Sequence, residues 1–441
     1  MSLSHILALL CALLFTLSFT YAQNPPVAPA NYDEAKVPKF ELTNPLKTTD
    51  GRIVDSPKLW NETRRPELLK SFEEQMFGKS PLHPTNYESM GFALTITDNI
   101  GGADSTVFNG KGTRYQIRIR LVKLEQQERP KEGDPTINVL VYTPNNVNGN
   151  TPLFVGLNFR GNHTVATDPG IELGAVWNNG KSEPAKEEER GSMASRWQIE
   201  KILDRGYAVA TAYYEDIEPD FDGGSKFGVR KMINMKDESN GGNAIATWAW
   251  GLTQIYNIVV GVYGERLNIA PTKIAVIGHS RLGKTALWAG ATNPEFALVI
   301  SNNSGCGGAA LSRREFGETV HRINTAFPHW FCGNFKKYNH DVNALPFDQH
   351  ELIALIAPRP VYIASAVEDC WADPKGEFLS GLYADPVYRL LGTDGIAGVT
   401  EMPPINTPVG GTIGYHIRTG VHDVTEYDWE QYLNFADKHF K

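Results

Sequence analysis

A serine framed by glycines is the residue best suited to covalent chemistry in this chain. Ser280 follows an apolar run, Ile274–Ile277, and lies within Gly278–Gly283, after which small residues compatible with a helix continue the chain. This order places a hydroxyl at a sharp turn between a buried strand and a helix, as in a nucleophile elbow, although the second glycine comes one residue late. A plain structural turn is the alternative. Two cations beside the serine, Arg281 and Lys284, favour a reactive site, because packing alone hardly explains them.

A serine hydroxyl attacks an ester when an imidazole takes its proton and a carboxylate orients that imidazole. Asp369 follows the apolar stretch Val361–Ala366, and His422 lies in a turn before the last predicted helix. The chain order serine, acid, histidine is that of the α/β-hydrolase triad. Glu368 and His416 are the neighbouring alternatives. We favour Asp369 as the acid, because a loop aspartate just past the strand has the short reach expected beside a turn histidine.

The tetrahedral intermediate of ester hydrolysis needs hydrogen-bond donors around its oxyanion. The residue after the nucleophile supplies one backbone N–H in this fold, and here that residue is Arg281. Its guanidinium can add a charge-assisted hydrogen bond. A second backbone donor is expected from the loop Asn158–His163, for which an ordinary glycine turn is an equally good interpretation.

A mostly parallel sheet is the scaffold that the hydrophobic pattern predicts. Alternation in residues 92–96 and 115–121 indicates antiparallel edge strands with one solvated face. From residue 137 apolar strands alternate with helices, which indicates a sheet covered on both faces, with chemistry at the carboxyl ends of its strands. Those strands are expected at Ile137–Tyr142, Leu153–Asn158, Tyr207–Tyr213, Ile274–Ile277, Leu298–Ser301 and Val361–Ala366. Helices are expected at Pro66–Phe77, Ala194–Asp204, Ala244–Val262 and Tyr427–His439. The predicted fold is an α/β-hydrolase three-layer sandwich.

Composition narrows the class of protein. The chain has 441 residues, of which 41% are apolar and 21% charged, as is ordinary for a soluble enzyme. A net charge of −8 without a basic run argues against nucleic-acid binding. No Cys/His cluster has metal-ligand spacing, so we predict neither a metal nor a cofactor. Without a repeat or a linker, residues 23–441 are predicted to form one catalytic domain with an N-terminal extension, and we expect a monomer.

The first 22 residues differ from the rest. Ile6–Phe19 is nearly all apolar and ends in small residues near Ala22, which predicts a cleaved secretory signal at 1–22. An uncleaved anchor is the alternative, but the run is short for a membrane span. We therefore expect an exported protein, either secreted or periplasmic. Three cysteines remain after cleavage, an odd number, so at least one thiol is free or pairs outside the chain, and a Cys306 to Cys332 bridge stays open.

Several spaced motifs together resemble the glucuronoyl esterases, carbohydrate esterase family fifteen, and most closely their bacterial members. Residues 278–284 read Gly-His-Ser-Arg-Leu-Gly-Lys, which is similar to the Gly-Cys-Ser-Arg-x-Gly-Lys signature of that family. Further matches follow in order at Asn158–His163, Asn303–Ala309, Phe327–Phe331, Ala357–Pro360, Trp371–Pro374 and at His422 before Asp428-Trp429.

The resemblance implies hydrolysis of the ester that joins 4-O-methyl-glucuronic acid of glucuronoxylan to an alcohol of lignin. It implies Ser280 as nucleophile, His422 as base and Arg281 as an aid to the oxyanion. On the substrate side it implies that Lys284 and Glu318 hold sugar hydroxyls and that Trp371 lies against the sugar ring. An ester with a planar apolar leaving group suits an aromatic-lined cleft, which His329, Trp330 and Trp371 can provide.

Two departures from the fungal pattern matter. Asn303 holds the position of the fungal triad acid, and an amide cannot stabilise imidazolium, so the acid must come from elsewhere. Some bacterial members use an aspartate after the later strand, which Asp369 matches. His279 replaces the cysteine beside the nucleophile and Asp423 follows the histidine, so the fungal disulfide between these loops is absent. Loop rigidity must then come from packing or hydrogen bonds.

Two other functions remain open. The main rival is an acetyl or feruloyl xylan esterase on the same fold, although an acetyl group offers nothing for Arg281 and Lys284 to hold. The other is a catalytically silent glycan-binding protein that lost its acid at Asn303. Such a protein would bind without turnover, and Asp369→Ala would leave its function unchanged.

Overall fold

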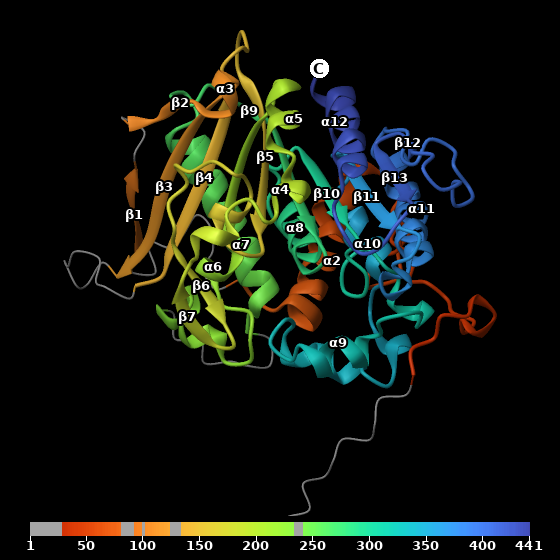
Figure 1. Ribbon diagram of the computed structural model, residues 1–441. Helices are drawn as coiled ribbons and strands as arrows, with labels where there is room; N and C mark the ends of the chain where they lie inside the picture. The colour runs from red at the N-terminus through yellow and green to blue at the C-terminus, as the bar shows by residue number, and fades with distance from the viewer. Residues whose placement is uncertain (1–28, 81–91, 99–101, 124–133, 233–240) are drawn as a thin grey trace, which may run out of the picture. The chain divides into compact units, whose positions relative to one another are not determined.

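The computed structural model describes residues 29–80, 92–98, 102–123, 134–232 and 241–441, with Asn31–Lys441 forming one compact unit (Figure 1). The predicted signal sequence at 1–22 lies outside the described residues.

One large sheet runs through this unit. Its strands lie in the order β1-β3-β4-β8-β5-β9-β10-β11-β13-β12, and β2 pairs with β3. The strands β8, β5, β9, β10, β11 and β13 are mutually parallel, whereas β1 to β4 are antiparallel and form one edge. Their bounds are β1 Phe92–Asp98, β2 Asp104–Thr106, β3 Gly112–Lys123, β4 Thr136–Pro144, β5 Thr151–Asn158, β8 Ala208–Tyr213, β9 Ile269–His279, β10 Leu298–Asn302, β11 Val361–Ala366, β12 Val409–Gly410 and β13 Ile413–Arg418. A separate hairpin joins β6 Ala175–Asn178 to β7 Lys181–Pro184.

Helices cover both faces of the sheet (Figure 1). The α-helices are α1 Pro57–Leu59, α2 Arg65–Phe72, α3 Val107–Gly110, α4 Ala194–Trp197, α5 Ile199–Asp204, α6 Tyr214–Ile217, α7 Ala244–Tyr256, α8 Arg281–Thr292, α9 Val320–Ala326, α10 Gln349–Ala354, α11 Pro374–Leu390 and α12 Glu426–Phe440. Turns of π-helix extend some of them at Trp60–Arg64, Glu73–Phe77 and Asn257–Val262.

The two faces follow from the alternation of side chains along each strand. In β9, Ile274 and Val276 belong to one apolar cluster with α7 and α8, whereas Ala275 and Ile277 belong to another with α5 and α12. The segment Ile274–Ile277 of this strand is therefore apolar throughout because both of its faces are buried. The three-layer sandwich and its antiparallel N-terminal edge agree with the prediction.

Some predicted elements differ in detail. Ile137–Tyr142 lies in β4, which is antiparallel to both neighbours, so the parallel part of the sheet is formed by later strands than we expected. The helix expected at Ala194–Asp204 is two helices, because Gln198 adopts a left-handed backbone with φ +43° between them. The strand β13 was not predicted, since His416 and Arg418 interrupt its apolar pattern, although all six of its residues are buried.

The described cysteines do not pair. Cys306 and Cys332 are buried thiols and Cys370 is exposed, and all three are free, so the bridge left open above does not form. Among the described residues, no helix is both long and apolar enough to cross a membrane.

Candidate active site

Ser280 lies between β9 and α8 with a positive backbone φ, at φ +57° and ψ −127°. Such a conformation is costly for a non-glycine residue and is typical of a nucleophile elbow. Gly278 makes the turn possible, because a Cβ there would overlap the carbonyl oxygen of Leu282. The Ser280 N–H donates to the carbonyl oxygen of Asn302 at 2.9 Å, which ties the turn to the end of β10.

Asp369 and His422 meet beside this turn. Asp369 follows β11, His422 follows β13, and the His422 Nδ1 lies 2.6 Å from Asp369 Oδ2. The amide of Asn303 donates to the same oxygen at 2.7 Å. Because Nδ1 donates to the carboxylate, Nε2 is left to accept a proton. Burial alone would raise the pKa of Asp369, but the hydrogen bond and charge of His422, with the bond from Asn303, lower it.

The structure distinguishes Asp369 and His422 from the alternative acid, Glu368, and the alternative histidine, His416. Glu368 is exposed, whereas Asp369 is buried. His416 is fully buried and pairs with Asp428 at 3.0 Å, so it lies outside the cavity described next.

A single cavity of about 310 Å³ brings together all seven residues selected from the sequence as catalytic or substrate-binding. Its lining consists of Ser280, Arg281, Lys284, Asn303, Ser304, Gly305, Glu318, Phe327, Trp330, Asp369, Trp371, Ala372 and His422. His422 leaves 40% of its side chain exposed and Trp371 is 41% exposed, so these two lining residues are accessible to a substrate from the solvent.

Arg281 is held by a buried carboxylate that the sequence did not single out. Its guanidinium donates to Asp220, which also accepts hydrogen bonds from His329 Nε2 and Trp330 Nε1, both at 2.7 Å. The Trp330 ring lies under the guanidinium, with 4.8 Å between its centroid and the Arg281 Cζ. Burial would raise the pKa of Asp220, but the bond from His329 and the charge of Arg281 lower it to about 2.

The aromatic lining differs from the prediction in one residue. Trp330 and Trp371 line the cavity as expected, but His329 does not, because its ring turns to the Asp220 carboxylate. Phe327 takes part in its place and stacks on Trp330 with 3.8 Å between ring centroids.

Lys284 and Glu318 face each other across the cavity wall. Their charged atoms are 4.0 Å apart, and Lys284 Nζ also donates to the carbonyl oxygen of Ser304. Both side chains are buried, and burial lowers the pKa of Lys284 and raises that of Glu318. The pair is too far apart for a direct hydrogen bond and presents a donor and an acceptor side by side, as recognition of hydroxyl groups requires.

The loop Asn158–His163 flanks the site and does not line its cavity. The Phe159 ring lies 5.9 Å from the Arg281 Cζ and 6.0 Å from the His279 ring. Asn158 Oδ1 accepts from the Gly161 N–H at 2.9 Å, which closes the loop as a turn.

The comparisons with known proteins agree with this architecture. Residues 187–392 match the family described as "Glucuronyl esterase, fungi". The chain is 48% identical over 419 residues to "Carbohydrate esterase MZ0003" of an unknown prokaryotic organism, covering 93% of this chain and 92% of that protein. A solved glucuronoyl esterase from Solibacter usitatus has a TM-score of 0.84 at 43% identity, covering 92% of this chain and 100% of the other. A structure described as a promiscuous CE15 esterase from the marine bacterial metagenome has a TM-score of 0.82 at 46% identity, with 93% and 100% covered.

Proposed function

The chain belongs to the glucuronoyl esterases of carbohydrate esterase family 15 and is a carboxylic ester hydrolase, and from this premise we propose its substrate and its catalytic residues. The proposed substrate is the ester between 4-O-methyl-glucuronic acid of glucuronoxylan and an alcohol of lignin. Curated fungal relatives named 4-O-methyl-glucuronoyl methylesterase support this choice of sugar acid, although they match only part of the chain.

In the proposed mechanism Ser280 Oγ attacks the ester carbonyl while His422 Nε2 takes its proton. Asp369 orients the imidazole and stabilises the imidazolium. The alcohol then leaves with the proton from His422, and a glucuronoyl ester remains on Ser280. A water molecule, activated by His422, hydrolyses this ester and restores the serine.

The oxyanion is proposed to lie at the start of α8. The first N–H groups of a helix have no intrahelical partner, so the Arg281 N–H is available to donate there. The Arg281 guanidinium adds a positive charge that Asp220 holds in place before the reaction, so little reorganisation is needed in the transition state.

Substrate binding is proposed to use the opposite wall of the cavity. Lys284 and Glu318 would hold hydroxyls of the glucuronic acid, and Trp371 would cover a face of the sugar ring. The observation that carries the whole proposal is that the bonded Asp369 and His422 pair lines the same cavity as Ser280 and this polar pair.

A wider ester specificity is the second candidate. One relative, at 46% identity, is described as a promiscuous CE15 esterase, so hydrolysis of acetyl or feruloyl esters on the same triad is a specific alternative.

The test compares benzyl glucuronate with an acetyl ester and a feruloyl ester, using wild type, Ser280→Ala and Asp369→Asn. Turnover of the glucuronate ester that is lost in Ser280→Ala and cut by orders of magnitude in Asp369→Asn supports the proposal. Preference for the acetyl or feruloyl ester would contradict the proposed substrate and leave the proposed triad standing. Absence of turnover with every ester would favour a silent glycan-binding protein.

We also propose that residues 1–22 direct export and are removed, which leaves a monomeric enzyme outside the cytoplasm. Amino-terminal sequencing of the protein from the culture medium and the periplasm tests this cleavage. A mature chain that begins at Met1 would contradict it.

A further inference from the structure

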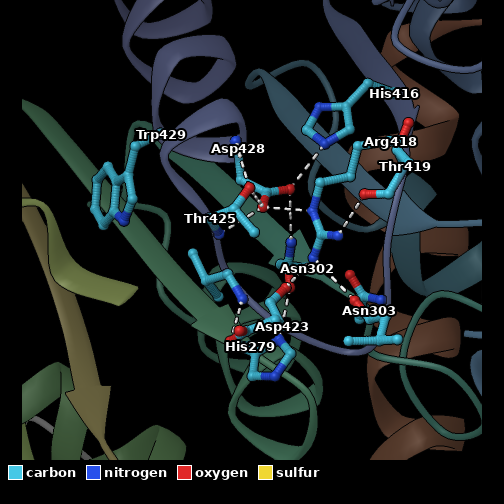
Figure 2. A network of polar contacts seen from close by, with 12 residues as sticks. His279, Asn302, Asn303, His416, Arg418, Thr419, Asp423, Thr425, Asp428 and Trp429 are labelled. Carbon is cyan, nitrogen blue, oxygen red and sulfur yellow. Dashed lines mark hydrogen bonds and ion pairs between the residues drawn. The ribbon is translucent and has the colours of Figure 1, made fainter. Parts of the chain in front are cut away.

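A buried network of polar contacts is centred on Asp428 (Figure 2). Asp428 belongs to the first turn of α12, where it forms a capping box with Thr425. Its carboxylate accepts hydrogen bonds from His416 Nε2 at 3.0 Å, from Arg418 Nε at 2.6 Å and from Asn302 Nδ2 at 3.2 Å. His416, Asn302 and Asp428 are fully buried and Arg418 is 2% exposed. The proposed reaction uses none of these four side chains.

Arg418 holds the turn that carries His422. While its Nε pairs with Asp428, its terminal nitrogens donate to the carbonyl oxygens of Thr419 at 3.0 Å, Val421 at 3.1 Å and Asp423. Those carbonyls lie on both sides of His422 in the chain. The planar guanidinium therefore fixes the backbone on which the imidazole is mounted.

The same carboxylate reaches the nucleophile turn through Asn302. Donation of Asn302 Nδ2 to Asp428 fixes the amide orientation, so its Oδ1 accepts from His279 Nδ1 at 2.6 Å. His279 directly precedes Ser280, and its ring lies 4.5 Å from the His422 ring. Burial and the nearby charge of His422 keep the pKa of His279 well below its usual value, so a neutral ring packs against the catalytic imidazole.

We propose that Asp428, Arg418, Asn302 and His279 form one positioning network that holds the His422 turn and the Ser280 turn in a fixed relation. The proposal rests on the catalytic roles of Ser280 and His422 given above. Catalytic groups must be held within about 0.5 Å of their productive geometry, and a displacement of about 1 Å costs about 100-fold in rate. The network acts on the alignment of the base and the nucleophile and leaves the sugar-binding wall unchanged.

A second buried pair offers a matched control. Asp348 forms a capping box at the start of α10 and pairs with Arg313, which donates to the carbonyl oxygens of Phe347 and Leu345. The chemistry is that of Asp428 and Arg418, an arginine bound to a helix-capping aspartate and wrapped by backbone carbonyls. Neither Asp348 nor Arg313 lines the catalytic cavity.

The experiment measures Tm, kcat and KM for wild type, Asp428→Asn and Asp348→Asn at a temperature at which all three are folded. Benzyl glucuronate is the substrate, or whichever ester the wild type hydrolyses fastest. We expect both variants to lose Tm, but only Asp428→Asn to lose kcat, by about 10- to 100-fold, with KM changed less than about twofold. Arg418→Lys keeps the charge and loses the carbonyl contacts, so its kcat is expected to lie between those of wild type and Asp428→Asn. This variant replaces Asp428→Asn in the test if Asp428→Asn does not fold.

A folded Asp428→Asn or Arg418→Lys with wild-type kcat would overturn the network and leave the triad intact. Equal losses of kcat in Asp428→Asn and Asp348→Asn would contradict the positioning role and show that the network only stabilises the fold. A wild-type protein that hydrolyses no ester would overturn the proposed function, and the positioning role with it.

Discussion

Two buried aspartates beside Ser280 each accept a hydrogen bond from a histidine, and they differ in what else they hold. Asp369 bonds His422 at 2.6 Å, and Asp220 bonds His329 at 2.7 Å. The partner of Asp369 leaves 40% of its side chain exposed at the cavity, whereas the partner of Asp220 is 11% exposed.

The other hydrogen bonds that each aspartate accepts explain why the two carboxylates differ in what they hold. Asp369 accepts its other side-chain bond from the neutral amide of Asn303, so its charge is directed to the imidazole. Asp220 accepts from Arg281 and Trp330 as well, so its charge is directed to a cation. An aspartate bonded to a histidine is therefore not a catalytic signature by itself. The other groups on the carboxylate decide whether it orients a base or anchors a positive charge.

Of the two aspartates, Asp369 is expected to show the larger loss of activity when its charge is removed. We expect Asp369→Asn to lower kcat by about 10⁴-fold, because the amide favours the wrong imidazole tautomer and cannot stabilise imidazolium. Initial rates on benzyl glucuronate measure this loss. Glu368→Gln, at the exposed neighbouring position, is the control and is expected to keep wild-type rates. Similar rates for both variants would remove Asp369 from the triad.

Removing the charge of Asp220 is expected to cost less. Asp220→Asn should lower kcat by about 10- to 100-fold, since Arg281 loses its fixed position and the oxyanion loses preorganised charge. His329→Gln keeps a donor to Asp220 and is expected to stay within about threefold of wild type, whereas His422→Gln should abolish turnover. Comparable losses in the two histidine variants would contradict the division of roles between the two pairs.

Acid titration sharpens the same comparison through stability. The pKa of Asp220 is about 2 in the folded protein and about 3.9 in an unfolded chain, so its stabilising contribution is complete above pH 4 and is lost as the pH falls toward 2. We expect Asp220→Asn to be less stable than wild type at pH 5, with a difference that shrinks toward pH 2. Urea unfolding at both pH values measures it. A constant difference would show that the charge of Asp220 does not stabilise the fold.

A third buried carboxylate, that of Glu377, should change the stability of the fold with pH in the opposite direction to Asp220. Burial raises the pKa of Glu377 to about 8, where it accepts from Ser365 Oγ at 2.6 Å and from the Gly305 N–H at 2.9 Å. Its unfolded pKa is about 4.3, so the folded state loses stability as the pH rises from about 4 to 8. Glu377→Gln is expected to match wild type near pH 4 and to have the higher Tm at pH 9. An advantage that does not grow with pH would contradict this assignment.

The sequence predicted the groups whose chemistry is local. Ser280 lies in a recognisable turn, and Asp369 and His422 follow it in the order that a known fold requires, so these residues could be proposed before their contacts were known. The central strands were predictable because burial on both faces makes them apolar throughout.

The groups that act through long-range contacts could not be predicted. Asp220 lies 61 positions from Arg281 in the chain, and no local pattern indicates that the two meet. The β13 strand carries His416 and Arg418, whose polarity is compensated by contacts distant in the sequence, above all with Asp428 on α12, so its pattern does not indicate a buried strand. His329 was misplaced for the same reason, since its partner Asp220 was unknown.

The free thiols have a consequence for how the protein reaches its folded state. Cys306, Cys332 and Cys370 form no bridge, and the turns that carry Ser280 and His422 are instead joined by hydrogen bonds through Asp428. Hydrogen bonds form as the chain collapses and need no oxidant, isomerase or reshuffling of mispaired cysteines. The catalytic domain should therefore mature equally well in a reducing compartment, with the same specific activity in dithiothreitol as in air.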